Sequence, residues 1–194
     1  MQLWKVLLGG IVVWFPFLDY LKYQFREINE LIEISVKNKN TNSLLNAILR
    51  HKLVEQTVHE LNQMYNKMIF ILFLASVPAI DIAVYMIHRG DTSIIVKLIS
   101  LGVGLTAINS VFALNYMCAQ IIRTAHKSRP LLYSFLIQNK LSFNQKLKIQ
   151  HFLEHLSGAD IDFYCLDLFP MNSARFSEFF IQVFIKYFLL IKLL

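Results

Sequence analysis

The sequence predicts an all-α fold, a polytopic membrane protein with four transmembrane helices and long cytosolic helical extensions. Of its 194 residues, 56% are hydrophobic and only 16% are charged, whereas soluble domains average about 25% charged residues. The charged residues cluster between long apolar runs instead of being spread over them. A membrane-spanning helix needs about 20 mainly apolar residues. Four stretches approach this length: 3–18, 68–87, 94–122 and 176–194.

The first stretch, 3–18, is the shortest and contains Lys5, two glycines and Pro16. A secretory signal peptide is an alternative reading of this segment. No small-x-small cleavage site follows it, however, and aromatic and charged residues continue from Phe15 to Tyr23. We therefore expect a retained membrane span.

The next two stretches are more strongly apolar. Pro78 and Asp81 alone interrupt 68–87. The stretch 94–122 exceeds the length that a straight span needs, so we expect it to tilt or to project into the cytosol.

The two polar segments, 19–67 and 123–175, keep apolar residues at helical spacing. The first reads as two amphipathic helices broken at 37–40, with Thr41 as the N-cap. The predicted apolar stripes are Leu44, Leu45, Ile48, Leu49, Leu53, Val58 and Leu61; then Leu131, Leu132, Phe135 and Leu136; then Leu147, Ile149, Phe152, Leu153 and Leu156. These helices would pack into a cytosolic platform or, alternatively, lie flat on the lipid surface.

The distribution of basic residues predicts the orientation in the membrane. The loop 19–67 holds seven Lys or Arg residues and 123–175 begins with six, whereas the short loop after 87 holds only Arg89. Positively charged loops stay in the cytosol. Both chain ends would then face outward, which is opposite to the cytosolic tail of a G-protein-coupled receptor.

Composition and motifs exclude several function classes. Cys118 and Cys165 allow at most one disulfide, and the net charge of +6 lies beside apolar spans, which disfavours nucleic-acid binding. We find no phosphate-binding loop, nucleophile elbow or paired catalytic carboxylates, and expect neither enzymatic activity nor a cofactor. The segment His151–His155 has the form H-x-x-E-H of an inverted zincin, but no third ligand accompanies it. Ordinary surface histidines are the favoured reading, and a zinc hydrolase is the alternative.

Polar residues inside the spans are candidates for function, because charges are costly in lipid and usually face protein or water. Asp81 and Tyr85 could line an outward-opening ligand pocket, or Asp81 could pair with His88 or Arg89 at the interface. In the third span, we expect small residues and hydrogen bonds to mediate helix packing. They are Ser100, Gly102, Gly104, Thr106, Ala107, Asn109, Ser110 and Asn115.

The last span carries a polar stripe. At 100° per residue one face presents Glu178, Gln182 and Lys186, and continues as Leu189 and Leu193. Such a stripe could line a pore, with the two leucines as a gate that closes by dewetting. The alternative is an ordinary helix interface in which Lys186 and Lys192 snorkel outward.

Three parts of the chain resemble the second half of an insect gustatory receptor, a family related to the odorant receptors. The first is Arg50-His51-x-Leu53 followed by Leu61-Asn62-x-x-Tyr65. The second is Phe152-Leu153-x-His155, then Ile161-x-Phe163 and 168–172. The third is 186–194, which lies where the family has Thr-Tyr, five apolar residues and Gln-Phe. Only Tyr187 matches that signature, because Lys186 replaces the threonine and Leu193 and Leu194 replace Gln-Phe.

The resemblance implies a ligand-gated cation channel in the plasma membrane, with seven spans per subunit and four subunits, homo- or heteromeric, around one pore. It implies that the last helix lines the pore, that the C-terminus is extracellular and that a small-molecule tastant binds in the outer half. The four spans here would be the fourth to seventh, so we expect a partial or truncated chain. Lys186 in place of threonine makes the ion selectivity uncertain. The alternative function is a non-catalytic four-span membrane adaptor.

Overall fold

The computed structural model describes residues 2–89, 91–157, 164–165, 169–170, 178, 181–182 and 185, and it describes side chains for those from Trp14 onward other than the four residues 164–165 and 169–170. Within these residues the chain is almost entirely helical. Its helices are α1 (Gln2–Lys37), α2 (Thr41–His88), α3 (Ile94–Ala125), α4 (Arg129–Gln138) and α5 (Phe143–His155). Two short strands, β1 (Tyr164–Cys165) and β2 (Phe169–Pro170), pair antiparallel, and β1 packs against α2.

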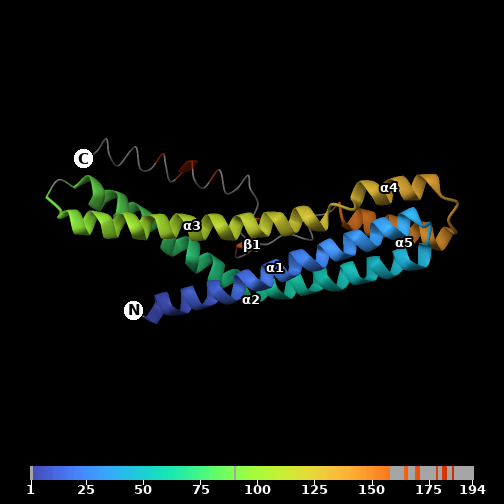
Figure 1. The fold of residues 1–194 in the computed structure, drawn as a ribbon, viewed down its shortest axis with the longest axis horizontal. Helices are drawn as coiled ribbons and strands as arrows, with labels where there is room; N and C mark the ends of the chain where they lie inside the picture. Colours follow the sequence, from blue (N-terminus) through green and yellow to red (C-terminus); the bar gives the residue numbers. More distant parts are fainter. Residues whose placement is uncertain are drawn as a thin grey trace.

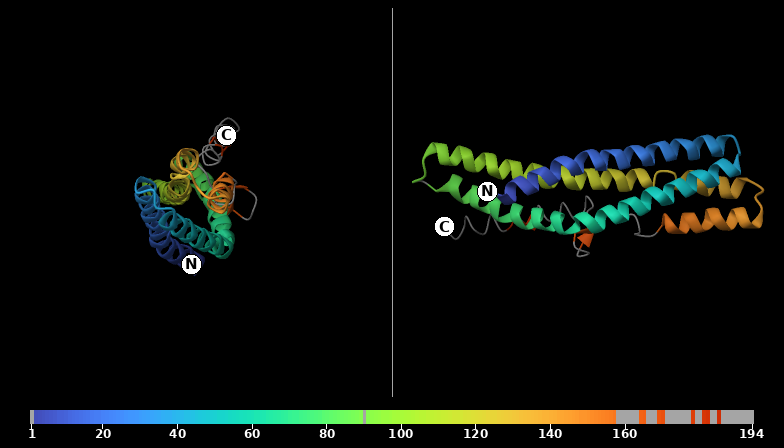
Figure 2. Two further views of the ribbon diagram at one scale, coloured as in Figure 1. Left: turned by 90° about the vertical axis from the view of Figure 1, so that its right-hand side faces the viewer. Right: turned by 90° about the horizontal axis from the view of Figure 1, so that it is seen from below.

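The helices form an elongated bundle in which α1 and α2 run antiparallel and α3 runs back beside both of them (Figures 1 and 2). α1 has 36 residues and α2 has 48. At 1.5 Å per residue these helices are about 54 and 72 Å long, whereas the hydrocarbon core of a bilayer is about 30 Å thick. The predicted spans 3–18 and 68–87 are therefore each one part of a longer helix that continues into the predicted cytosolic extension.

Two helical segments are long and apolar enough to cross a membrane, Thr41–His88 and Ile94–Gln138, the second of which joins α3 and α4. They contain the predicted spans 68–87 and 94–122. Most of the predicted fourth span, 176–194, lies outside the described residues.

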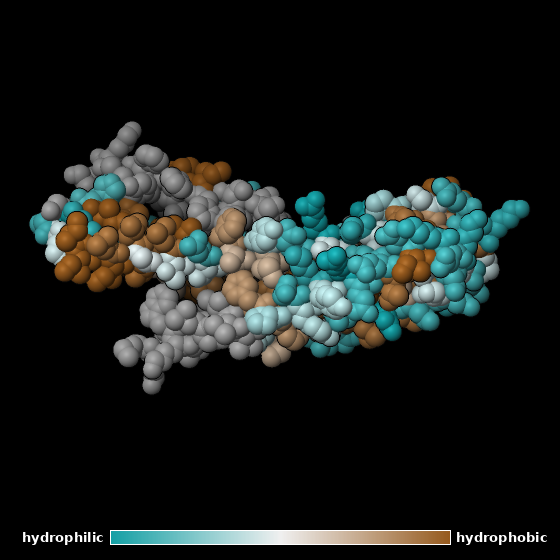
Figure 3. Space-filling model, viewed as in Figure 1, coloured by the Kyte–Doolittle hydropathy of each residue, from teal (hydrophilic) through white to brown (hydrophobic). Residues whose placement is uncertain are grey.

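The two ends of the bundle differ in surface chemistry. At one end the hairpin of α2 and α3 exposes apolar side chains, and at the other end the surface is mostly hydrophilic (Figure 3). The exposed apolar side chains of the hairpin include Ile82, Ile94, Ile95, Leu98, Ile99, Leu101, Leu105 and Phe112. We call the end with the α2–α3 hairpin the apolar end and the hydrophilic part the polar bundle. The polar bundle comprises α1 from Asp19, α2 up to Lys67, the end of α3, and α4 and α5.

The break between α1 and α2 confirms the predicted turn and corrects its cap. Asn40, not Thr41, is the N-cap of α2, because its side chain accepts a hydrogen bond from the Ser43 amide. The Lys39 amide donates to the Val36 carbonyl and the Asn40 amide to the Ser35 carbonyl. This is the Schellman pattern, with Lys39 at the left-handed position, φ 51°.

The apolar stripes of the polar bundle are confirmed in part. Leu44, Ile48, Val58, Leu132, Phe135, Ile149, Phe152, Leu153 and Leu156 are buried as predicted. Leu49, Leu53 and Leu147 are exposed instead. On α2 the buried stripe includes His51 and Glu55, which the hydrophobic pattern did not predict. α4 and α5 pack against each other and against the long helices, which favours the platform over helices lying flat on lipid.

Candidate functional site

The predicted ligand-pocket residues lie at the apolar end. Asp81 is half-buried, and Tyr85 is exposed at its edge. Arg89 donates Nε to Asp91 Oδ1 at 2.7 Å and Nη1 to Tyr85 Oη at 3.5 Å. Of the two alternative partners of Asp81, Arg89 pairs with Asp91 instead.

The predicted pore residues are only partly described. Glu178 and Gln182 are helical and exposed, as are Ile181 and Ile185 between and after them. Lys186, Tyr187, Leu189 and Leu193 lie outside the described residues, as does Lys192.

Close packing between α2 and α3 depends on small residues, as predicted. Gly104 and Ala107 are buried, and a Cβ added at Gly104 would lie 3.0 Å from the Ala83 Cβ. Gly102 is exposed, with nothing within 4 Å of an added Cβ. The hydrogen bonds differ from the prediction, because the hydroxyls of Thr106 and Ser110 and the Asn115 amide donate to carbonyls four residues earlier in α3 itself.

The H-x-x-E-H segment does not assemble a metal centre among the described residues. His151 is exposed on α5, and Glu154 accepts a hydrogen bond from Gln150. His155 turns toward α2 instead, where its Nδ1 lies 3.3 Å from Glu55 Oε1. No group of three or more His, Cys, Asp or Glu residues converges within the described part of the chain.

His51 is a buried polar group within the polar bundle. Its side chain is fully buried and lies between Phe25 of α1 and Phe152 of α5, with each ring centroid 5.0 Å away. The His51 Nε2 lies 3.2 Å from the Ala125 carbonyl oxygen at the end of α3. Because a carbonyl only accepts, the proton of the neutral ring is on Nε2. The Nδ1 atom is then unprotonated.

Glu55 links His51 to α5. One turn after His51 on α2, it is also buried, and its Oε2 lies 4.0 Å from His51 Nδ1, too far for a hydrogen bond. Its Oε1 faces His155 of α5. His51, Glu55 and His155 thus join α2, α3 and α5, and we call these three side chains the histidine junction.

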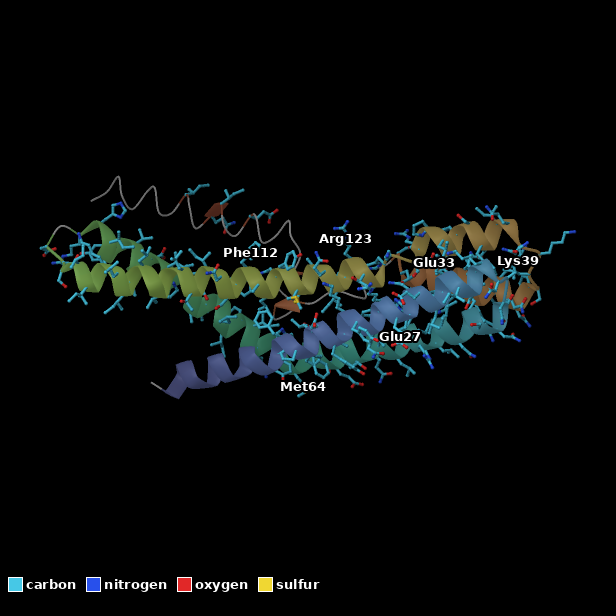
Figure 4. The ribbon with its side chains drawn as sticks, in the orientation of Figure 1. Glu27, Glu33, Lys39, Met64, Phe112 and Arg123 are labelled. Atoms are coloured by element: carbon cyan, nitrogen blue, oxygen red, sulfur yellow. The ribbon has the colours of Figure 1, made fainter. Side chains whose placement is uncertain are left out.

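A second buried polar contact holds the end of α3 to α1. Asn29 Nδ2 donates to the Thr124 carbonyl oxygen at 2.7 Å, and the Ser128 hydroxyl donates to Asn29 Oδ1. His51 and Asn29 thus bind the Ala125 and Thr124 carbonyls at the end of α3, and the Thr124 carbonyl also accepts from the Lys127 amide at 3.2 Å. Figure 4 shows the region from Arg123 of α3 down to Lys39 at the tip of the polar bundle.

A cavity of about 490 Å³ opens beside Asn29 and Ser128, between α1 and the end of α3. It is lined by two cations and two carboxylates, Arg26, Lys127, Glu30 and Glu33. Lys37 hydrogen-bonds to Glu33 and holds the pKa of its carboxyl below the usual value. Because its charges balance, the cavity attracts neither anions nor cations strongly.

Burial determines the charge of His51. Removal of the ring from water lowers the pKa of His51 from 6.5 to about 4; the hydrogen bond to Ala125 opposes this shift, and the nearby His126 and His155 add to it. His51 is therefore neutral at physiological pH, because desolvation of the buried ring is the largest influence on its pKa.

The sequence offered one signal for this site. Positions 44, 48, 51, 55, 58 and 62 repeat at helical spacing, and in the structure all six are buried. Three of these six positions are polar, His51, Glu55 and Asn62, and the adjacent turns of His51 and Glu55 indicate a buried polar pair. Asn29 and Ser128 had no such signal, because their partners lie 95 and 99 residues away.

No protein-family model matches the sequence, and no curated protein matches it either.

Proposed function

We propose that the chain is a subunit of a ligand-gated, mainly cation-conducting chemoreceptor channel of the gustatory receptor type, located in the plasma membrane. The proposal is supported most by the position of the basic segments. Residues 19–67 and 123–157 pack into one polar bundle, whereas the turn at 89–93 lies at the opposite end. Both basic segments would then face the cytosol.

This topology supports an outward C-terminus, which the resemblance to gustatory receptors implies. Glu178, Gln182 and Ile185 are helical, which supports a last helix that could leave the polar bundle and cross outward. The exposed Glu178 and Gln182 would face an aqueous path shared with other subunits.

The long helices suggest how ligand binding could reach the pore. α2 and α3 run without a break from the apolar end into the polar bundle, so a shift near Asp81 and Tyr85 would move the far ends of the same rigid helices. A tastant that binds the open packing more tightly than the closed one would shift the population toward the open state.

Current recordings from cells that express the full chain, alone and with other receptor subunits, test this proposal. Gln182→Cys should make the current sensitive to a charged, thiol-reactive reagent, and Ile181→Cys, one residue away on another face, is the matched control. The proposal fails if no subunit combination gives a current, or if the reagent blocks both variants equally.

A non-catalytic membrane adaptor is the alternative. This alternative would be supported by a cytosolic partner that binds the polar bundle in cells that show no ligand-dependent current. Asp81→Asn separates the two functions, because it should weaken the response to ligand in a receptor and leave partner binding by the distant polar bundle unchanged.

A further inference from the structure

We infer that the histidine junction is a proton-sensitive latch, in which protonation of His51 releases α5 from the polar bundle. The inference concerns the polar bundle itself and holds whether or not the chain conducts ions. It rests on three facts: His51 is completely buried, it has a single hydrogen-bond partner among the residues that the structure describes, and Phe152 of α5 packs against its ring.

The contacts of His51 favour the neutral ring. Ala125 accepts from Nε2, and in the described residues no hydrogen bond reaches Nδ1. A second proton on Nδ1 would place a cation between Phe25 and Phe152, with no acceptor at hydrogen-bond distance. Burying an unpaired charge is far more costly than burying a neutral ring.

Among the described side chains, titratable groups face His51 from α2, α3 and α5. On α1 the neighbour is Phe25, which carries no charge. On α3 it is His126, and on α5 it is His155; a proton on either repels one on His51. Glu55 on α2 is the one carboxylate in contact, and it lies closer to His155 than to His51, at 3.3 against 4.0 Å.

α5 is a short helix at the periphery of the polar bundle. It has 13 residues, and it packs against α4 and α2, whereas α1, α2 and α3 pack against one another over much longer contacts. Phe152 and His155 both belong to α5, so its departure exposes the His51 ring and separates Glu55 from its nearest histidine. Local opening of a short peripheral element requires less free energy than opening of the core.

The direction of the pH effect follows from linkage. The folded His51 binds a proton with a pKa of about 4, whereas an exposed histidine binds it near 6.5. Between these values the open state binds more protons than the closed one, so acid favours the open state. Lowering the pH from 7.5 to 5.5 should therefore raise the population of the open state about tenfold.

Hydrogen exchange of the full chain in detergent tests this directly. Protection factors of the amides in 143–155, corrected for the intrinsic pH dependence of exchange, should fall about tenfold between pH 7.5 and 5.5. His51→Gln should abolish this fall, because glutamine can still donate to Ala125 and does not titrate. Unchanged or increased protection at pH 5.5, or an equal fall in the variant, would refute the latch.

A second measurement covers the case in which the variant does not fold. Nitrogen chemical shifts of histidine-labelled protein report the protonation state of each ring. His51 should remain a neutral ring with a protonated Nε2 in the closed state at pH 5.5. An imidazolium at His51 while α5 stays protected would show that Glu55 accommodates the charge, and would overturn the proposal.

Discussion

Asn29 and Thr124 are 95 residues apart in the chain, and yet the Asn29 side-chain amide donates to the Thr124 carbonyl at 2.7 Å. This contact fixes the middle of the polar part of α1 to the last turn of α3. The Ser128 hydroxyl completes it by donating to the Asn29 carbonyl oxygen. A buried amide with both of its ends bonded defines the register of two long helices more strictly than apolar packing does.

Replacement of Asn29 by alanine should therefore destabilise the polar bundle by about 1–2 kcal/mol, because Ser128 loses its acceptor and Thr124 loses a donor. The buried thiol of Cys118 provides the readout, since a thiol-reactive dye reaches it only on unfolding. Thermal unfolding would be followed in a Cys165→Ser background. Asn46→Ala is the matched control on an exposed site of α2, and its effect should stay within about 0.5 kcal/mol. Equal effects of the two changes would contradict this role of Asn29.

Gly104 should tolerate no larger side chain. A Cβ there lies 3.0 Å from the Ala83 Cβ, so Gly104→Val forces α2 and α3 apart and should cost about 1–3 kcal/mol. Gly102→Val introduces the same side chain on the same helix into open space and should be nearly neutral. The same dye assay compares the two variants. If Gly102→Val is the more damaging one, the helix interface has been assigned to the wrong face.

Lys39 occupies a left-handed backbone conformation, φ 51°, that disfavours side chains with a Cβ. Lys39→Gly should raise the stability of the α1–α2 hairpin by about 0.5–1 kcal/mol, because glycine reaches this conformation without strain. Lys39→Val should lower it, since a β-branched side chain suffers most there. Unfolding midpoints of the three proteins should follow the order Gly, Lys, Val, and any other order would contradict the Schellman turn.

The sequence predicted the helices well, and the apolar stripes only in part. Long apolar runs at helical spacing determine where helices lie, and the turn at 37–40 was recognisable from its polar residues. Leu49 and Leu53 were assigned to the core because they are hydrophobic, but they are exposed, and His51 and Glu55 are buried in their place. Hydrophobicity alone cannot reveal this, because contacts from α3 and α5 make the buried polar groups acceptable.

The candidate site was less predictable than the fold. Each candidate site predicted from the sequence lies within one span: Asp81 and Tyr85 in the second, and the stripe that begins at Glu178 in the last. The histidine junction instead combines residues of α2 and α5 with a main-chain carbonyl of α3. Such a site depends on the tertiary arrangement. Asp91 similarly replaced Asp81 as the partner of Arg89, because the helix ends at His88 and the following turn brings Asp91 within 2.7 Å.

Labelling of single cysteines in intact cells tests the membrane topology, on which the proposed function depends. In a Cys165→Ser background, a membrane-impermeant maleimide should label Asp91→Cys from outside and Lys39→Cys only after permeabilisation. Both positions are exposed, so a difference between them reports the side of the membrane. Labelling in the reverse pattern would place the polar bundle outside and contradict the account, as would equal labelling of both in intact cells or recovery of the chain in the soluble fraction.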